Sequence, residues 1–71
     1  KKRMTYQEKQ EWASIEADIE SLENRIAAIE EEMQANGSDF GKLATLQKEL
    51  DEKNEELLEK YERYEYLSEL A

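Results

Sequence analysis

The sequence contains no cysteine, no histidine and no proline, and only two of its 71 residues are glycine. Without cysteine there is no disulfide and no thiolate metal site, and without histidine the usual catalytic triads and zinc sites are excluded as well. There is no glycine-rich loop that could cradle a phosphate. The many carboxylates are not desolvated and point in different directions along a helix. We therefore expect no catalytic, cofactor-binding or metal-binding residue in this chain.

The sequence also lacks long apolar runs. None approaches the ~20 residues that span a bilayer, and none has the form of a signal-peptide core. Together with the missing cysteines, this favours a cytoplasmic protein with no membrane partner. Because the chain starts at Lys1 rather than at a methionine, we expect it to be a fragment of a longer protein.

Charge is abundant but uneven. The net charge is −9, with 41% charged residues against 38% hydrophobic ones, a composition typical of long helices or of disorder. Residues 1–10 carry four bases against one acid, whereas residues 11–38 carry eight acids against one base and residues 39–71 carry ten acids against five bases. An acidic surface repels nucleic-acid phosphates, so only the N-terminal end has a charge that attracts them.

Apolar side chains recur every three or four residues on both sides of a central turn signal, Asn36-Gly37-Ser38. Before the turn the spacings alternate between three and four without a break, at Trp12, Ile15, Ile19, Leu22, Ile26, Ile29 and Met33. After the turn one step of four replaces a three, which is a stutter, in the series Leu43, Leu46, Leu50, Asn54, Leu57, Tyr61, Tyr64 and Ser68. Such a narrow apolar seam needs another helix as its partner.

The pattern predicts an all-α fold, a two-helix antiparallel coiled-coil hairpin over residues 5–71. We expect a helix over 5–36, a turn at 36–38 and a second helix over 39–70, preceded by a basic linker remnant at 1–4.

Local signals mark the helix ends. Thr5 and Glu8 have the spacing of a capping box. Gly37 suits the left-handed position past a helix end, and Ser38 suits the N-cap of the second helix. Phe40 is expected to cover the closed end of the hairpin.

Residues at equal distances from the turn should face one another in the hairpin. Met33 then meets Leu43, and Trp12 meets Tyr64. The same rule pairs opposite charges bordering the seam, namely Glu16 with Lys60, Glu23 with Lys53, Arg25 with Asp51 and, two residues out of register, Glu32 with Lys42. This pairing within one chain predicts a monomer in isolation, with an intermolecular coiled coil as the alternative. Asn54 either fixes the register or tilts out to water.

The open end of the predicted hairpin gathers basic and aromatic residues, a combination that binds nucleic acid through phosphate contacts and base stacking. The candidate nucleic-acid contacts are Lys1, Lys2, Arg3, Tyr6, Lys9, Arg63 and Tyr66. A structural role is the favoured interpretation for Trp12, Tyr61 and Tyr64, which would fill the wider end of the coiled coil. For Lys1, Lys2 and Arg3 the end of a solvated linker is the favoured interpretation, and a patch that contacts phosphate is the alternative.

Four stretches of the sequence resemble the C-terminal domain of ABC-F ATPases of the Uup type. Met4-Thr5-Tyr6-Gln7-Glu8-Lys9-Gln10-Glu11 is similar to that domain's Leu-(Ser/Thr)-Tyr-Lys-Glu-Gln start, and the run from Ile15 to Glu23 resembles its Ile-Glu-x-x-Ile-Glu-x-Leu-Glu segment. Asp39-Phe40-Gly41-Lys42-Leu43 resembles the entry to its second helix. The closing Glu62-Arg63-Tyr64-Glu65 matches its Glu-Arg-Trp-Glu motif, with Tyr64 in place of tryptophan.

The resemblance implies a small accessory coiled coil tethered to two upstream ATP-binding cassettes, where ATP and magnesium would bind. Members of the family act mostly on the ribosome, and Uup-type C-terminal domains are associated with DNA binding. The expected function is therefore contact with DNA, ribosomal RNA or the ribosome through the open end. The alternative is a purely structural or protein–protein interaction coiled coil.

Overall fold

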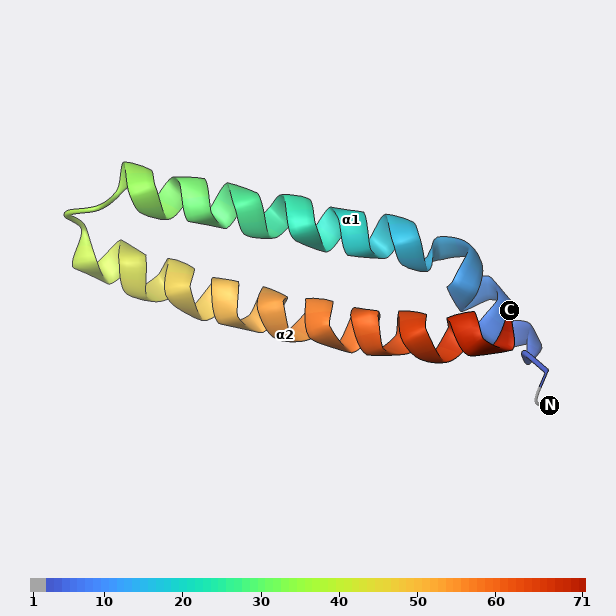
Figure 1. Ribbon diagram of the computed structural model, residues 1–71. Helices are drawn as coiled ribbons and strands as arrows, with labels where there is room; N and C mark the ends of the chain where they lie inside the picture. Colours follow the sequence, from blue (N-terminus) through green and yellow to red (C-terminus); the bar gives the residue numbers. More distant parts are fainter. Residues whose placement is uncertain (1–2) are drawn as a thin grey trace.

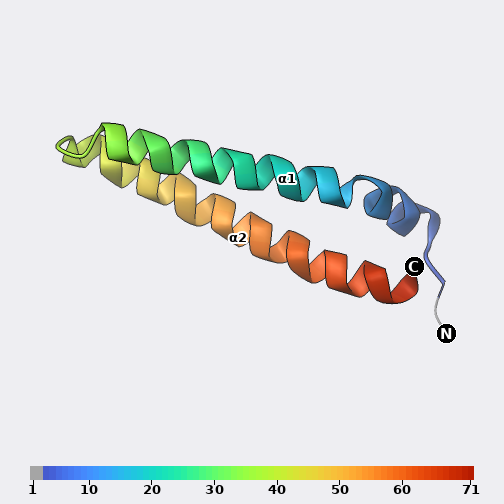
Figure 2. The same ribbon diagram turned by 45° about the horizontal axis from the view of Figure 1, so that its top comes forward.

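The computed structural model describes residues 3–71 and forms two helices that lie side by side and are joined by a short turn (Figure 1). Helix α1 spans Tyr6–Ala35 and helix α2 spans Phe40–Leu70. The helices run antiparallel in both views, so the N and C ends lie at the same pole (Figures 1 and 2). The Cα atoms extend over 54 × 15 × 15 Å. The predicted all-α antiparallel hairpin is confirmed.

The capping box predicted at the start of α1 is confirmed. The backbone N–H of Glu8 donates to Thr5 Oγ1 at 3.1 Å, and the backbone N–H of Thr5 donates to Glu8 Oε1 at 2.8 Å. Two amides that would otherwise have no partner at the helix end are thereby satisfied, which fixes the start of α1.

The turn differs from the prediction at two positions. Gly37 was expected to be left-handed, but no residue in the described part of the chain has a positive φ. Asn36 ends α1 instead, since its side-chain Nδ2 donates to the carbonyl of Glu32 at 2.7 Å. The N-cap of α2 is Asp39 rather than Ser38, because the Asp39 carboxylate accepts from the backbone N–H of Lys42 at 3.1 Å.

The core is a single seam between the helices. Its most deeply buried side chains are Ile15 and Ile29 of α1 and Leu46 and Leu67 of α2. Each belongs to a seam in which the spacing between residues alternates between three and four. Close packing along such a seam is the main stabilising contribution in a coiled coil.

The predicted stutter in α2 is wrong. Asn54, Tyr61 and Ser68 are exposed, so for Asn54 the alternative of tilting out to water holds. The seam alternates three and four without interruption along the half-buried or buried residues Leu43, Leu46, Leu50, Lys53, Leu57, Lys60, Tyr64 and Leu67. Lysine tolerates such a position because its methylene stem covers apolar surface while the ammonium reaches water.

Phe40 does not cover the closed end of the hairpin, because 81% of its surface is exposed. It is the first residue of α2, and the side chain of Asp39 caps the helix at that point. The turn therefore closes through hydrogen bonds of Asn36 and Asp39 rather than through an aromatic lid.

Candidate functional site

The open end is formed by the first turns of α1 and the last turns of α2, which lie together at the pole opposite the turn (Figure 1). The rings of Trp12 and Tyr64 meet here with centroids 5.2 Å apart and planes tilted by 34°. This is the facing pair predicted from equal distance to the turn, so these two aromatics belong to the coiled coil. Leu67 is fully buried beside them in the seam.

Arg63 is held within the molecule at this end. Its Nε and a terminal guanidinium nitrogen each donate to the Glu11 carboxylate at 2.8 Å. Its guanidinium also stacks over the ring of Tyr66, 5.1 Å from the centroid. The bidentate bond lowers the pKa of Glu11 and raises that of Arg63. Two of the predicted nucleic-acid contacts, Arg63 and Tyr66, thus have internal partners.

Glu8 links this cluster to the start of α1. Its pKa is lowered chiefly by the hydrogen bond from the backbone N–H of Thr5, and further by Tyr66 and Arg63. A carboxylate that accepts from the helix N-terminus while facing a guanidinium is stabilised in its charged form. The cap of α1 and the end of α2 are in this way electrostatically coupled.

The other predicted contacts that the structure describes face solvent. Arg3, Tyr6 and Lys9 are all exposed, and 75% of the Tyr6 surface is accessible. The Tyr6 hydroxyl accepts from Gln10 Nε2 at 2.9 Å, a contact within α1. None of the four ion pairs found within residues 3–71 uses Arg3 or Lys9. Lys1 and Lys2 lie outside the described residues.

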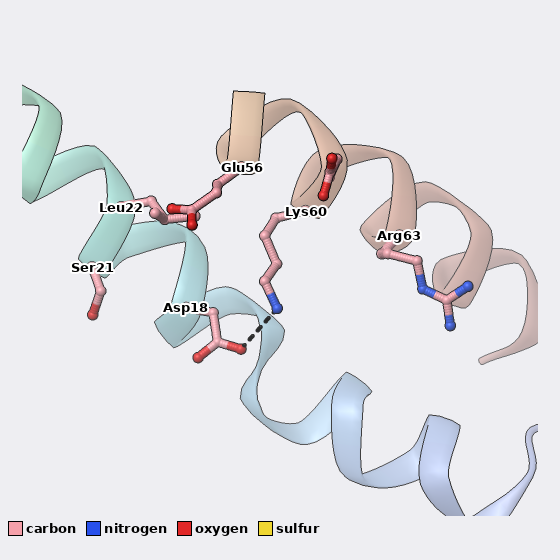
Figure 3. Close-up of a pocket in the computed structure, with 7 residues that line it drawn as sticks. Asp18, Ser21, Leu22, Glu56, Lys60 and Arg63 are labelled. Carbon is pink, nitrogen blue, oxygen red and sulfur yellow. Dashed lines mark hydrogen bonds and ion pairs between the residues drawn. The ribbon is translucent and has the colours of Figure 1, made fainter. Parts of the chain in front are cut away.

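The two long sides of the hairpin differ in their charges. We call the neutral flank the side bordered by Glu11, Asp18, Arg25 and Glu32 of α1 and by Lys42, Glu49, Glu56 and Arg63 of α2. Lys53 and Lys60 of the seam lean towards it, so that five bases stand against five acids. Here Arg25 pairs with Glu49 at 2.6 Å, and Lys60 reaches out of the seam to Asp18 at 3.5 Å. Figure 3 shows Lys60 crossing a groove of about 560 Å³ between the helices. Four of the five cations of this flank form ion pairs with carboxylates of the same chain, and Lys42 forms none within residues 3–71.

These contacts replace the ion pairs expected from the sequence. Lys60 pairs with Asp18 rather than Glu16, Lys53 with Glu56 rather than Glu23, and Arg25 with Glu49 rather than Asp51. Glu32 and Lys42 form no ion pair within the described residues. The reason is the corrected seam, because Lys53 and Lys60 occupy seam positions and lean towards the neutral flank, whereas Glu16 and Glu23 lie on the other side. Counting the two lysines as seam residues would have revealed this arrangement. The spacing then alternates between three and four without a break at Leu50, Lys53, Leu57, Lys60, Tyr64 and Leu67.

No group of three metal-ligating side chains is found between residues 3 and 71. In the same part of the chain no helix combines the length and the apolar character needed to cross a membrane. The groove in Figure 3 is lined by three carboxylates, the ammonium of Lys60 and the guanidinium of Arg63, and within it Lys60 pairs with Asp18.

Comparisons with known proteins match nearly the whole chain. The family model described as the ABC transporter C-terminal domain matches residues 3–69. The uncharacterized ABC transporter ATP-binding protein YfmR of Bacillus subtilis (strain 168) is 37% identical over 68 residues, which cover 96% of this chain and 11% of that protein. No solved structure matches. The chain therefore spans about 11% of the length of this curated relative.

Proposed function

The chain belongs to the ABC transporter C-terminal domain family, and from this premise we propose that it is the accessory coiled coil of an ABC-F ATPase of the Uup type. In this proposal the hairpin is tethered to upstream ATP-binding cassettes in a cytoplasmic protein, and ATP and magnesium bind in those cassettes. The hairpin itself is non-catalytic and monomeric in isolation. The relative in Bacillus subtilis is named as an ABC transporter ATP-binding protein, which supports ATP-binding cassettes as neighbours of the hairpin.

We further propose that the open end contacts nucleic acid, either DNA or the RNA of the ribosome. The observation that carries this proposal is the exposure of Arg3, Tyr6 and Lys9 at one pole of a molecule whose net charge is −9. Two cations beside an accessible aromatic ring supply phosphate contact and base stacking together. The acidic remainder of the surface repels phosphate and restricts the contact to this pole.

Binding of the 71-residue chain to duplex DNA, single-stranded DNA and a ribosomal RNA hairpin, measured by fluorescence anisotropy across a salt titration, tests the proposal. Replacing Arg3 and Lys9 by glutamine should weaken binding and reduce the slope of log K against log salt by about two. The matched control replaces Lys42 and Lys48, two exposed lysines towards the turn, and should leave the slope unchanged. Absence of binding to all three nucleic acids at low ionic strength contradicts the proposal.

A structural role in the parent protein is the second candidate. It is favoured by the internal pairing of Arg63 with Glu11 and of Lys60 with Asp18, which occupies two cations that a nucleic acid would otherwise use. In that case deletion of the hairpin should lower the melting temperature or alter the assembly of the parent ATPase, while its nucleic-acid affinity stays the same. The molar mass of the isolated chain, measured by light scattering, tests whether it is a monomer. A dimeric mass would support an intermolecular coiled coil.

A further inference from the structure

The side of the hairpin opposite the neutral flank has a different composition. We call it the acidic flank, and it is bordered by Glu16, Glu23 and Glu30 of α1 and by Gln47, Asn54, Tyr61 and Ser68 of α2. The two helices meet on this side through hydroxyls, since Tyr61 donates to Glu23 and Tyr64 donates to Glu16 at 3.4 Å. No lysine or arginine occupies these border positions from Glu16 to Ser68, and Lys9 lies one heptad earlier, at the open end.

The acidic flank also exposes apolar surface. A shallow groove of about 280 Å³ lies between the helices and is lined by Glu16, Ile19, Tyr61 and Tyr64. Next to it, one helical turn from Tyr61, 59% of the Leu58 surface and 43% of the Tyr61 surface are accessible. Exposed leucine and tyrosine beside a groove and between carboxylates is the arrangement expected of a binding face with an apolar centre and a charged rim.

We propose that the acidic flank is a docking surface for a cationic amphipathic helix of a partner protein. Lysines or arginines of that helix pair with Glu16 and Glu23, and its apolar side chains cover Leu58 and the ring of Tyr61. The partner thereby becomes a third helix along the hairpin. This surface is separate from the open end and stands independently of the proposed nucleic-acid contact.

The geometry of the flank favours a helix as the occupant. Glu16 and Glu23 are one heptad apart on a continuous helix, which places them about 10.5 Å from each other along its axis. A partner helix repeats its own side chains at the same interval, so one cation per heptad meets each carboxylate in turn.

Charge decides against the other occupants. A nucleic acid would place phosphates against three glutamates with no compensating base on this side. A second copy of this chain would present another acidic flank, or a flank on which every cation except Lys42 is already paired with a carboxylate of its own chain. No metal-binding group of three side chains occurs within residues 3–71, which removes the simplest inorganic ligand.

The test uses the 71-residue chain and a synthetic three-heptad peptide with two leucines and two lysines per heptad, the remainder being alanine and glutamine. Binding is measured by isothermal titration calorimetry at low ionic strength and mapped by amide chemical shifts. We expect the Glu16→Gln/Glu23→Gln variant to bind the peptide about fivefold more weakly or worse. The largest changes in amide chemical shift on peptide binding should occur at and around Ile19, Leu58 and Tyr61.

The matched control is Glu31→Gln/Glu52→Gln, which removes the same charge from exposed positions away from both flanks. It should change the affinity by less than about twofold. Leu58→Ser should also weaken binding, and because this side chain is exposed, circular dichroism should find the helices intact. Equal losses in the two glutamate variants would mean unspecific attraction to an acidic protein and would overturn the proposal. Absence of peptide binding, or shifts confined to the neutral flank, would overturn it too.

Discussion

The two ends of the hairpin are held together in different ways. At the turn, Asn36 and Asp39 close the chain with short-range hydrogen bonds, and the aromatic side chain beside them, Phe40, is mostly in water. At the open end, Leu67 is fully buried, Trp12 meets Tyr64, and Arg63 is fixed to Glu11 by two hydrogen bonds. The end without a covalent connection is the one with the denser set of side-chain contacts.

Chain connectivity accounts for this difference. Next to a short turn the two helices are already at a high effective concentration, so their ends meet at little cost in loop entropy. At the opposite pole the ends would fray unless side chains held them, because terminal helical turns lack some of their backbone hydrogen bonds. Aromatic, ionic and capping contacts at the open end therefore take over the role that the covalent link has at the turn.

The largest expected effect comes from removing the buried side chain at the open end. Leu67→Ala should destabilise the hairpin by about 2–5 kcal/mol, because it removes apolar contacts and leaves a cavity. Phe40→Ala at the turn should change stability by less than about 0.5 kcal/mol, since that ring is exposed. Urea unfolding followed by circular dichroism measures both. Similar losses in the two variants would contradict the contrast between the ends.

The cap of α2 gives the next effect. Asp39→Ala should cost about 1 kcal/mol, because the backbone N–H of Lys42 loses its acceptor. Ser38→Ala should be close to neutral, although serine is also a common N-cap residue. Comparing the two melting temperatures identifies the cap, and a larger loss for Ser38→Ala would contradict the assignment of Asp39.

A stabilising change is expected at Gly37. Its φ is not positive, and an added Cβ would meet its nearest neighbour, the Gln34 carbonyl oxygen, at an ordinary 3.7 Å. Gly37→Ala should therefore stabilise the hairpin by about 0.4–1 kcal/mol, because alanine lowers the entropy of the unfolded chain. Thermal unfolding measures the shift. A fall in melting temperature would instead indicate the left-handed conformation that the sequence suggested.

The smallest effect concerns the ion pair at the open end and its pH dependence. Arg63 lowers the pKa of Glu11 in the folded state below its ordinary value of 4.5. As the pH falls towards that ordinary pKa, the unfolded chain therefore binds protons before the folded chain does. The contribution of Glu11 is thus complete at neutral pH and is lost as the pH falls through the depressed pKa. The melting temperature of the Glu11→Gln variant should be slightly lower than that of the unsubstituted chain at pH 7. In acid the two melting temperatures should be equal. A difference that persists or grows in acid would contradict this linkage.

The fold could be predicted from the sequence because one signal dominates it. The apolar spacing from Trp12 to Met33, the central turn and the matching positions after Leu43 all favour a hairpin of two helices. The facing of Trp12 and Tyr64 followed from that symmetry, and the capping box followed from residue types with a specific hydrogen-bonding role.

The details that failed were decided by side-chain length and local competition. The sequence pattern predicts Asn54 and Tyr61 in the seam, whereas the stems of Lys53 and Lys60 fill it and their ammonium groups reach carboxylates. Ser38 and Asp39 can both cap a helix, and only the path of the chain selects between them. The partners of Arg63 at the open end depend on the exact rotation of both helices, which spacing alone does not give.

The dimensions of the hairpin have a mechanical consequence. It is a rod with a long axis of 54 Å and a width of 15 Å, and both of its ends leave from one pole. Whatever is joined to those ends holds the rod at its base, so a slight rotation there becomes a wide sweep of the distant turn. The uninterrupted seam stiffens the shaft against bending. The hairpin is in this respect a lever arm, and its length sets how far a small movement at the base is amplified.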